Sequence, residues 1–154
     1  MDYTNRQNTI VFIGSDHAGF WAKQKTCDYI RSLEYQIEDL GTDSEKPVDY
    51  PDYAIKVAQR VRETPGACGI VFCGTGIGVS ITANKVPGIR AALCTSPYHV
   101  EMARRHNDAN VLALGARIST FEEIKKMIDV WFSTPFDGGR HQRRVEKIHL
   151  LTGC

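Results

Sequence analysis

One stretch limits the possible folds of this chain more than any other: residues 69–80, with the sequence Gly-Ile-Val-Phe-Cys-Gly-Thr-Gly-Ile-Gly-Val-Ser. Its apolar beginning is too short for a helix and typical of a buried strand, and glycines alternate after the cysteine that ends it. Residues 81–85 return to a composition that suits a helix. The stretch therefore predicts a buried strand, a tight loop and the start of a helix.

The loop that this pattern predicts suits an anion. Glycines at 74, 76 and 78 leave backbone N–H groups uncovered, so a ligand can approach them, and a helix start favours negative charge. A thiol at the entrance of such a loop, here Cys73, has its thiolate form stabilised. We therefore interpret the loop as an anion cradle with a reactive group at its mouth. The alternative, a loop that only lets a helix pack close to a strand, stays open.

Strand and helix patterns alternate along the whole chain. Apolar runs at 10–14, 35–40, 69–73, 90–94 and 111–115 predict five strands, and helical spacing or capping signals follow each of them. Such alternation with short connections predicts a single-domain α/β fold, a Rossmann-like open parallel five-stranded sheet with helices on both faces. We expect the domain over residues 10–154 and a flexible tail over residues 1–9.

Two helices near the C-terminus carry specific expectations. Ser119 followed by Glu122 predicts a capping box at the start of one helix. The last helix is expected to begin after Gly138-Gly139 and to turn Val145 and Ile148 toward the core.

Several polar residues follow predicted strands, which is where open parallel sheets bind ligands. Asp16 and His17 follow the first strand, Cys73 ends the third, and Arg117 follows the fifth. Asp16 and His17 also fit a simple helix cap, so that interpretation stays open.

Two pairs of candidate binding residues lie at predicted helix ends. His106 and Asn107 fit either a functional pair or an ordinary helix C-terminus. Arg140 and Arg144 share one face of the last helix, near its start, where cations need a compensating anion.

Composition excludes several classes of protein. A formal net charge of +1 gives no basis for nucleic-acid or membrane binding, and no apolar run has the length of a membrane span or a signal peptide. Five cysteines without CxxC spacing argue against disulfides and a metal site, so we expect a cytoplasmic protein with reduced thiols. The spacing around Cys73 also fails for a Cys-x5-Arg phosphatase, a Walker loop and a dinucleotide fingerprint. What remains fits a small phosphorylated metabolite handled by metal-free proton transfer.

Six blocks in order resemble the ribose-5-phosphate isomerase type B family, which includes isomerases of six-carbon sugar phosphates. They are Gly14-Ser15-Asp16-His17-Ala18-Gly19, Asp49-Tyr50-Pro51, Cys73-Gly74-Thr75-Gly76-Ile77-Gly78, Ala83-Asn84-Lys85, His106-Asn107-Asp108 and Gly138-Gly139-Arg140-His141-Gln142-x-Arg144. The resemblance implies an aldose–ketose isomerase that interconverts ribose 5-phosphate and ribulose 5-phosphate through an enediolate, in the pentose phosphate pathway. It also implies no cofactor and no metal, and a homodimer with sites at the subunit interface.

The resemblance assigns roles to particular residues. Cys73 is implied as the base, with the hydroxyl of Thr75 and the loop amides stabilising the enediolate; His106 and Asp16 are implied to open the sugar ring. The implied substrate and phosphate contacts are His17, Tyr50, Gly74, Thr75, Gly76, Ile77, Gly78, Asn107, Arg117, Arg140 and Arg144, together with Asp16. A branch of the family uses a carboxylate base, but residues 74–82 contain no Asp or Glu, so the thiol branch fits better.

Three alternatives stay open at this point. The substrate can be a six-carbon sugar phosphate such as allose 6-phosphate or galactose 6-phosphate. The protein can be a non-catalytic module that binds phosphorylated metabolites, or a redox sensor built on Cys73. Catalysis on ribose 5-phosphate separates the isomerase hypothesis from the non-catalytic module, which would lack this activity.

Overall fold

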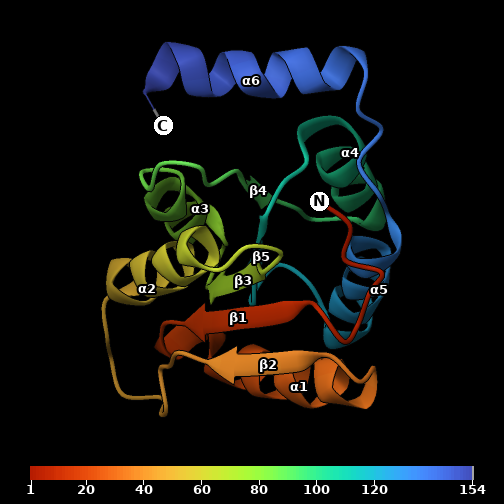
Figure 1. Ribbon diagram of the computed structural model, residues 1–154. Coiled ribbons are helices and arrows are strands. Elements are labelled where there is room, and N and C mark those ends of the chain that lie inside the picture. Colours follow the sequence, from red (N-terminus) through yellow and green to blue (C-terminus); the bar gives the residue numbers. More distant parts are fainter. Residues whose placement is uncertain (154) are drawn as a thin grey trace.

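Five short parallel strands pair in the order β2-β1-β3-β5-β4 (Figure 1) in a computed structural model that describes residues 1–153. The strands are β1 (Ile10–Ser15), β2 (Gln36–Asp39), β3 (Cys68–Cys73), β4 (Ala91–Leu93) and β5 (Val111–Gly115). The helices are the 3-10 turn η1 (His17–Gly19), α1 (Phe20–Ser32), α2 (Tyr50–Glu63), α3 (Ile77–Ala83), α4 (Pro97–Asn107), α5 (Phe121–Ser133) and α6 (Arg140–Thr152).

The helices cover the two faces of the sheet in separate layers. One buried cluster joins α1, α4 and α5 to the sheet, and the other joins α2 and α3 to it. The central strands β3 and β5 are buried along their whole length, which explains why their sequences are continuous apolar runs instead of alternating ones. The predicted fold class, a five-stranded parallel α/β sheet with helices on both faces, is confirmed.

The strand order changes direction between β1 and β3. From β1 the chain moves outward to β2, and it then crosses back to form β3 on the other side of β1. The carboxyl ends of β1 and β3 therefore lie side by side at a topological switch point, where sheets of this kind bind ligands. Asp16 follows one of these strands and Cys73 ends the other.

The cap of α5 lies one residue later than predicted. Thr120, not Ser119, is the N-cap: its hydroxyl accepts the N–H of Glu123 at 3.3 Å, and the Glu123 carboxylate accepts the N–H of Thr120 at 2.7 Å. The sequence offers two overlapping Ser/Thr-x-x-Glu patterns, so the pattern alone does not select between them.

Within residues 1–9, predicted to be a flexible tail, two side chains are buried against the body. The Tyr3 side chain is 1% exposed and stacks on Trp131, with 5.9 Å between ring centroids. Thr9 is buried as well. A polar segment with one aromatic anchor resembles a tail in composition, and only the tertiary contact distinguishes the two.

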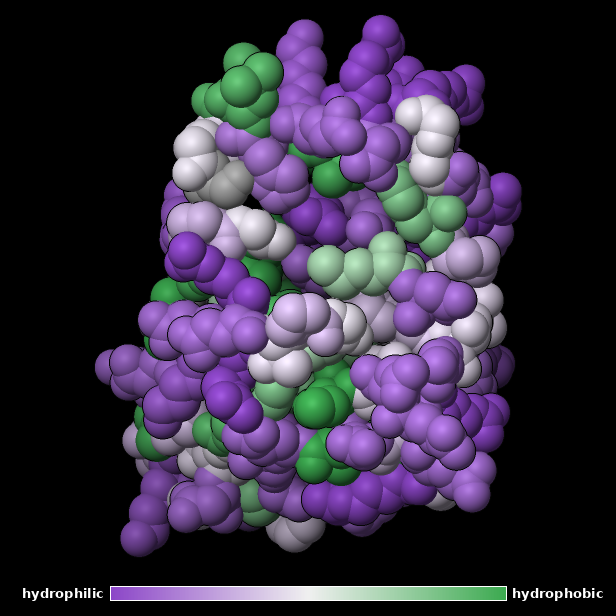
Figure 2. All heavy atoms as spheres, viewed as in Figure 1, coloured by the Kyte–Doolittle hydropathy of each residue, from purple (hydrophilic) through white to green (hydrophobic). Residues whose placement is uncertain are grey.

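Helix α6 lies apart, along the β4 edge of the sheet (Figure 1). Val145 is buried as expected, but Ile148 is 43% exposed, so the prediction that it turns inward is wrong. Leu150 and Leu151 are more exposed still, and the surface is hollowed below the helix (Figure 2) by a cavity of about 570 Å³. Among residues 1–153, no helix is both long and apolar enough to span a membrane.

Candidate active site

Two groups of side chains hold the residues that the sequence singled out. The carboxyl-edge group comprises Asp16, His17, Tyr50, residues 73–78 and Arg117, at the ends of β1, β3 and β5. The α4–α6 group comprises His106, Asn107, Arg140, His141 and Arg144, where the end of α4 meets the start of α6.

Cys73 faces the glycine loop. Its sulfur accepts the backbone N–H of Gly76 at 3.1 Å, and the side chain is 5% exposed. Gly76 has φ +80°, and a Cβ placed there would lie 2.5 Å from the Leu93 side chain. Only glycine satisfies both the left-handed conformation and this close approach, so the loop geometry depends directly on the sequence pattern.

The other described cysteines are different. Burial raises the pKa of Cys27 to about 11 and the pKa values of Cys68 and Cys94 to about 12. All four described cysteines are unpaired. The thiols of Cys27, Cys68 and Cys94 stay protonated at neutral pH and behave as small apolar side chains.

Asp16 and His17 come directly after β1 and lie beside the end of β3. The Asp16 N–H donates to the carbonyl of Phe72 at 3.3 Å, and its Oδ1 accepts the N–H of Gly19 at 3.0 Å. Asp16 therefore caps the η1 turn, and it uses one oxygen of its carboxylate to do so. His17 Nδ1 lies 3.2 Å from both the backbone nitrogen and the carbonyl oxygen of Val48, so the ring is held against that backbone.

Tyr50 and Arg117 close over the same loop. A Cβ on Gly78 would lie 2.6 Å from the Tyr50 ring, and a Cβ on Gly74 would lie 3.4 Å from the Arg117 side chain. The two glycines thus let an aromatic ring and a guanidinium pack directly on the backbone. Sulfur, carboxylate, hydroxyl, imidazole and guanidinium groups meet at one edge of the sheet.

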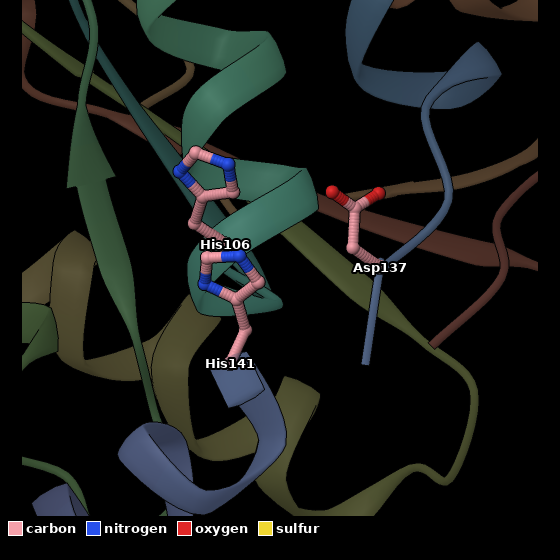
Figure 3. A group of neighbouring side chains, drawn as sticks. All are labelled: His106, Asp137 and His141. Carbon is pink, nitrogen blue, oxygen red and sulfur yellow. The ribbon is translucent and has the colours of Figure 1, made fainter. Parts of the chain in front are cut away.

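The α4–α6 group is built on two stacked imidazoles (Figure 3). The rings of His106 and His141 lie 4.2 Å apart and almost parallel, at 4°. Burial, followed by the neighbouring His106 and arginines, lowers the pKa of His141 below its usual value. Asp137 lies close by and is held by Arg105, whose Nε donates to its two carboxylate oxygens at 3.1 and 3.2 Å.

A metal ion fits this histidine pair poorly. Ligand atoms of His106, Asp137 and His141 lie within 4.8 Å of one another. However, the lone pairs of an imidazole lie in the plane of its ring, so two parallel stacked rings aim them along parallel planes and not at one point. The geometry suits anion binding beside arginines better than metal coordination.

The two groups lie at opposite ends of the sheet within one chain. The N–H of Gly69, near the start of β3, donates to the carbonyl of Asn110, just after α4, at 2.9 Å. Cys73 lies four residues further along β3, which at about 3.3 Å per residue places it roughly 13 Å away. One chain therefore does not bring Cys73 together with His106, Arg140 and Arg144.

His141 and the Arg105–Asp137 ion pair belong to the α4–α6 region, although the sequence assigned no role to them. His141 lies within the Gly-Gly-Arg-His block, yet no spacing rule shows that its ring stacks on His106, because they belong to different helices. The Arg105–Asp137 pair gave no signal at all, since the two residues are far apart in sequence and both look like ordinary surface charges.

Comparison with known proteins agrees with this architecture. Residues 11–148 match the family described as ribose/galactose isomerase. The chain belongs to this family. The resemblance seen in the sequence is thereby confirmed.

Family members with names or solved structures cover nearly the whole chain. Ribose-5-phosphate isomerase B of Escherichia coli K12 is 44% identical over 141 residues, 92% of this chain and 95% of that protein. The structure of ribose-5-phosphate isomerase B from Clostridium thermocellum is 46% identical, with TM-score 0.92, and the match covers 94% of this chain and 97% of that one. The Mycoplasma genitalium enzyme, solved with bound ribulose-5-phosphate, is 39% identical, with TM-score 0.90 and the same coverages.

Proposed function

We propose that this protein is an aldose–ketose isomerase that interconverts ribose 5-phosphate and ribulose 5-phosphate, a step of the pentose phosphate pathway. The observation that carries the proposal is the Cys73 sulfur facing the glycine loop at the switch point of the sheet. The named Escherichia coli relative and the Mycoplasma genitalium structure with ribulose-5-phosphate support the substrate.

Cys73 carries out the proton transfer between C2 and C1 of the sugar. Its thiolate takes the proton from C2 of the open-chain aldose, and the electron pair forms the C1–C2 double bond of an enediolate. After a proton has passed from O2 to O1, the same sulfur returns its proton to C1 while the C2 carbonyl forms, which gives the ketose. Charge develops on the sugar oxygens only in transit, so the loop amides of residues 74–78 and the Thr75 hydroxyl stabilise the transition state selectively.

Ring opening precedes this step because ribose 5-phosphate is mainly a cyclic sugar. His106 and Asp16 act as the acid–base pair that moves a proton from the C1 hydroxyl to the ring oxygen. Tyr50 and Asn107 contact the sugar. His17 and Arg117 from one side, and Arg140 and Arg144 from the other, bind the phosphate, since guanidinium groups pair with phosphate oxygens in a bidentate manner.

Such a site needs two copies of the chain, and we propose a homodimer. The carboxyl-edge group of one copy then receives the α4–α6 group of the other. Exposed apolar side chains on α3 (Ile77 and Ile81) and on α6 (Leu150 and Leu151) provide surface for an interface of this kind. A two-fold arrangement completes two equivalent sites at once.

The test uses solvent exchange. Ribulose 5-phosphate cannot close a five-membered ring because its C5 oxygen carries the phosphate, so loss of its C1 proton requires Cys73 but no ring chemistry. In D₂O, proton NMR should show that Cys73→Ala loses this exchange, by about 10²–10⁴-fold. His106→Gln should keep the exchange while losing turnover of ribose 5-phosphate. Cys94→Ala, which removes a buried thiol, serves as the matched control. A Cys73→Ala protein that still exchanges the proton would overturn the proposal.

Two further properties are the chain length of the preferred sugar phosphate and the cellular compartment of the protein. The family description includes galactose as well as ribose, so allose 6-phosphate and galactose 6-phosphate belong in the same coupled assay, and we expect ribose 5-phosphate to give the highest kcat/KM. We also propose a cytoplasmic location, which the unpaired state of the four described cysteines supports.

A further inference from the structure

The first residues of the chain precede the part that matches the family, which begins at residue 11, and they are nevertheless well anchored. The Tyr3 ring is 1% exposed and its hydroxyl lies 3.5 Å from the carbonyl of Ala67. The carbonyl of Tyr3 accepts the hydroxyl of Tyr35 at 3.0 Å. We name residues 1–4 the N-terminal strap.

The strap covers a buried arginine on α4. Arg104 is 0% exposed, and its guanidinium lies 4.4 Å from the centre of the Tyr3 ring, a buried cation–π contact. Its Nη2 donates to the carbonyl of Met1 at 2.5 Å. The strap therefore provides both an aromatic face and a hydrogen-bond acceptor to the same guanidinium.

The other side of this guanidinium holds the turn that ends α4. Arg104 Nη1 donates to Asp108 Oδ1 at 3.1 Å and to the carbonyl of Ala109 at 2.5 Å. Asp108 has φ +43°, a left-handed conformation that costs energy for a residue with a Cβ. Such a conformation persists where surrounding contacts hold it, and Arg104 supplies two of them.

His106 and Asn107 come immediately before this turn. Arg90 also braces it, with Nε donating to the carbonyl of Asn107 at 2.8 Å. The continuous path of contacts thus runs from Tyr3 through Arg104 to Asp108 and the two residues before it.

We propose that the N-terminal strap positions His106 and Asn107 for catalysis by fixing Arg104 against the turn at Asp108. The inference rests on the proposed isomerase function for the role of His106. Tyr3 and Arg104 are positioning residues in this scheme, because neither reaches the substrate.

The decisive variant is Tyr3→Leu, which keeps apolar volume under the strap but removes the ring from Arg104. Its kcat/KM for ribose 5-phosphate should fall about tenfold, the order expected when a catalytic group is displaced by a fraction of an ångström. The His106 resonances in a ¹⁵N-histidine NMR spectrum should shift with it. Tyr3→Phe keeps the ring and should restore kcat/KM to within about twofold of the wild type.

Val61→Ala is the matched control for destabilisation alone. Val61 is buried in the α2 layer on the opposite face of the sheet, so its truncation should lower Tm and leave the kinetics and the His106 resonances unchanged. All kinetics are measured well below the unfolding temperature of each variant.

A folded Tyr3→Leu protein with wild-type kcat/KM and unmoved His106 resonances would overturn the inference. If Tyr3→Leu does not fold, Arg104→Lys replaces it, because lysine keeps the charge but lacks the planar fork that serves Met1 and Asp108 together. If the wild type does not turn over ribose 5-phosphate, the proposed function fails, and the His106 resonances still decide whether the strap positions the turn.

Discussion

Glycine at position 76 is required for two separate reasons, and a matched glycine separates them. Gly76 and Gly88 have nearly equal φ, +80° and +82°, but a Cβ on Gly76 would meet Leu93 at 2.5 Å while a Cβ on Gly88 would meet nothing within 4 Å. The first reason is the backbone conformation, which both share. The second is the close packing behind the cradle, which belongs to Gly76 alone.

We predict that Gly88→Ala lowers the free energy of unfolding by about 1 kcal/mol through its backbone conformation. Gly76→Ala should cost about 1–3 kcal/mol more, because it overpacks the loop, and it should also abolish turnover by moving the amide that faces Cys73. Urea unfolding and the isomerase assay measure the two effects. Equal losses of stability in the two variants would contradict the packing argument.

At the same scale, the sequence placed Asp16, Cys73 and Arg117 at the ends of strands, as the structure has them, but gave no sign of the histidine stack. Cys73 stands out from Cys68 and Cys94 because it ends a strand beside alternating glycines, and that is a local signal. The contact of His106 with His141 depends on how α6 packs against α4, which no short-range pattern encodes.

Among the elements, α5 begins at a place where two overlapping capping patterns compete, and only one of them forms the N-cap. Ser119-x-x-Glu122 and Thr120-x-x-Glu123 both satisfy the capping rule, and the structure uses the second. The helix that starts at Phe121 carries Ile124, Ile128 and Trp131 on its buried face. The sequence thus predicted the helix and missed its first residue by one.

Thr120→Ala should therefore lower the free energy of unfolding by about 1 kcal/mol, because it removes the acceptor for the N–H of Glu123. Ser119→Ala, its neighbour and control, should change stability by less than about 0.5 kcal/mol. Thermal and urea denaturation of both variants provide the measurement. A larger loss for Ser119→Ala would restore the original prediction.

At the scale of the whole molecule, the two groups of candidate site residues lie at opposite ends of one sheet. The alternation of elements predicted a parallel sheet but not its strand order, and motif matching alone treats all matched residues as one cluster. The topology shows otherwise: α4 runs back to the start of β5, so His106 lies at the amino end of the sheet and Cys73 at the carboxyl end.

Subunit mixing tests the proposed shared site. Cys73→Ala and the double variant Arg140→Ala/Arg144→Ala should each be nearly inactive alone. After dissociation and reassociation of equal amounts, about a quarter of wild-type activity should return, since half the dimers are mixed and one of their two sites is intact.

Cys73→Ala mixed with Arg117→Ala is the control for this experiment. Both lesions lie in the carboxyl-edge group, so no mixed dimer has an intact site and activity should stay at the level of the parents. Recovery in the control, or none in the first mixture, would argue against a site shared between copies.

The position of α6, along the sheet edge with its leucines in solvent, has a consequence for a newly made chain. In the homodimer that we propose, a single association event covers these apolar side chains and completes the pocket. On that proposal, the concentration of the chain sets its resistance to aggregation and its turnover together.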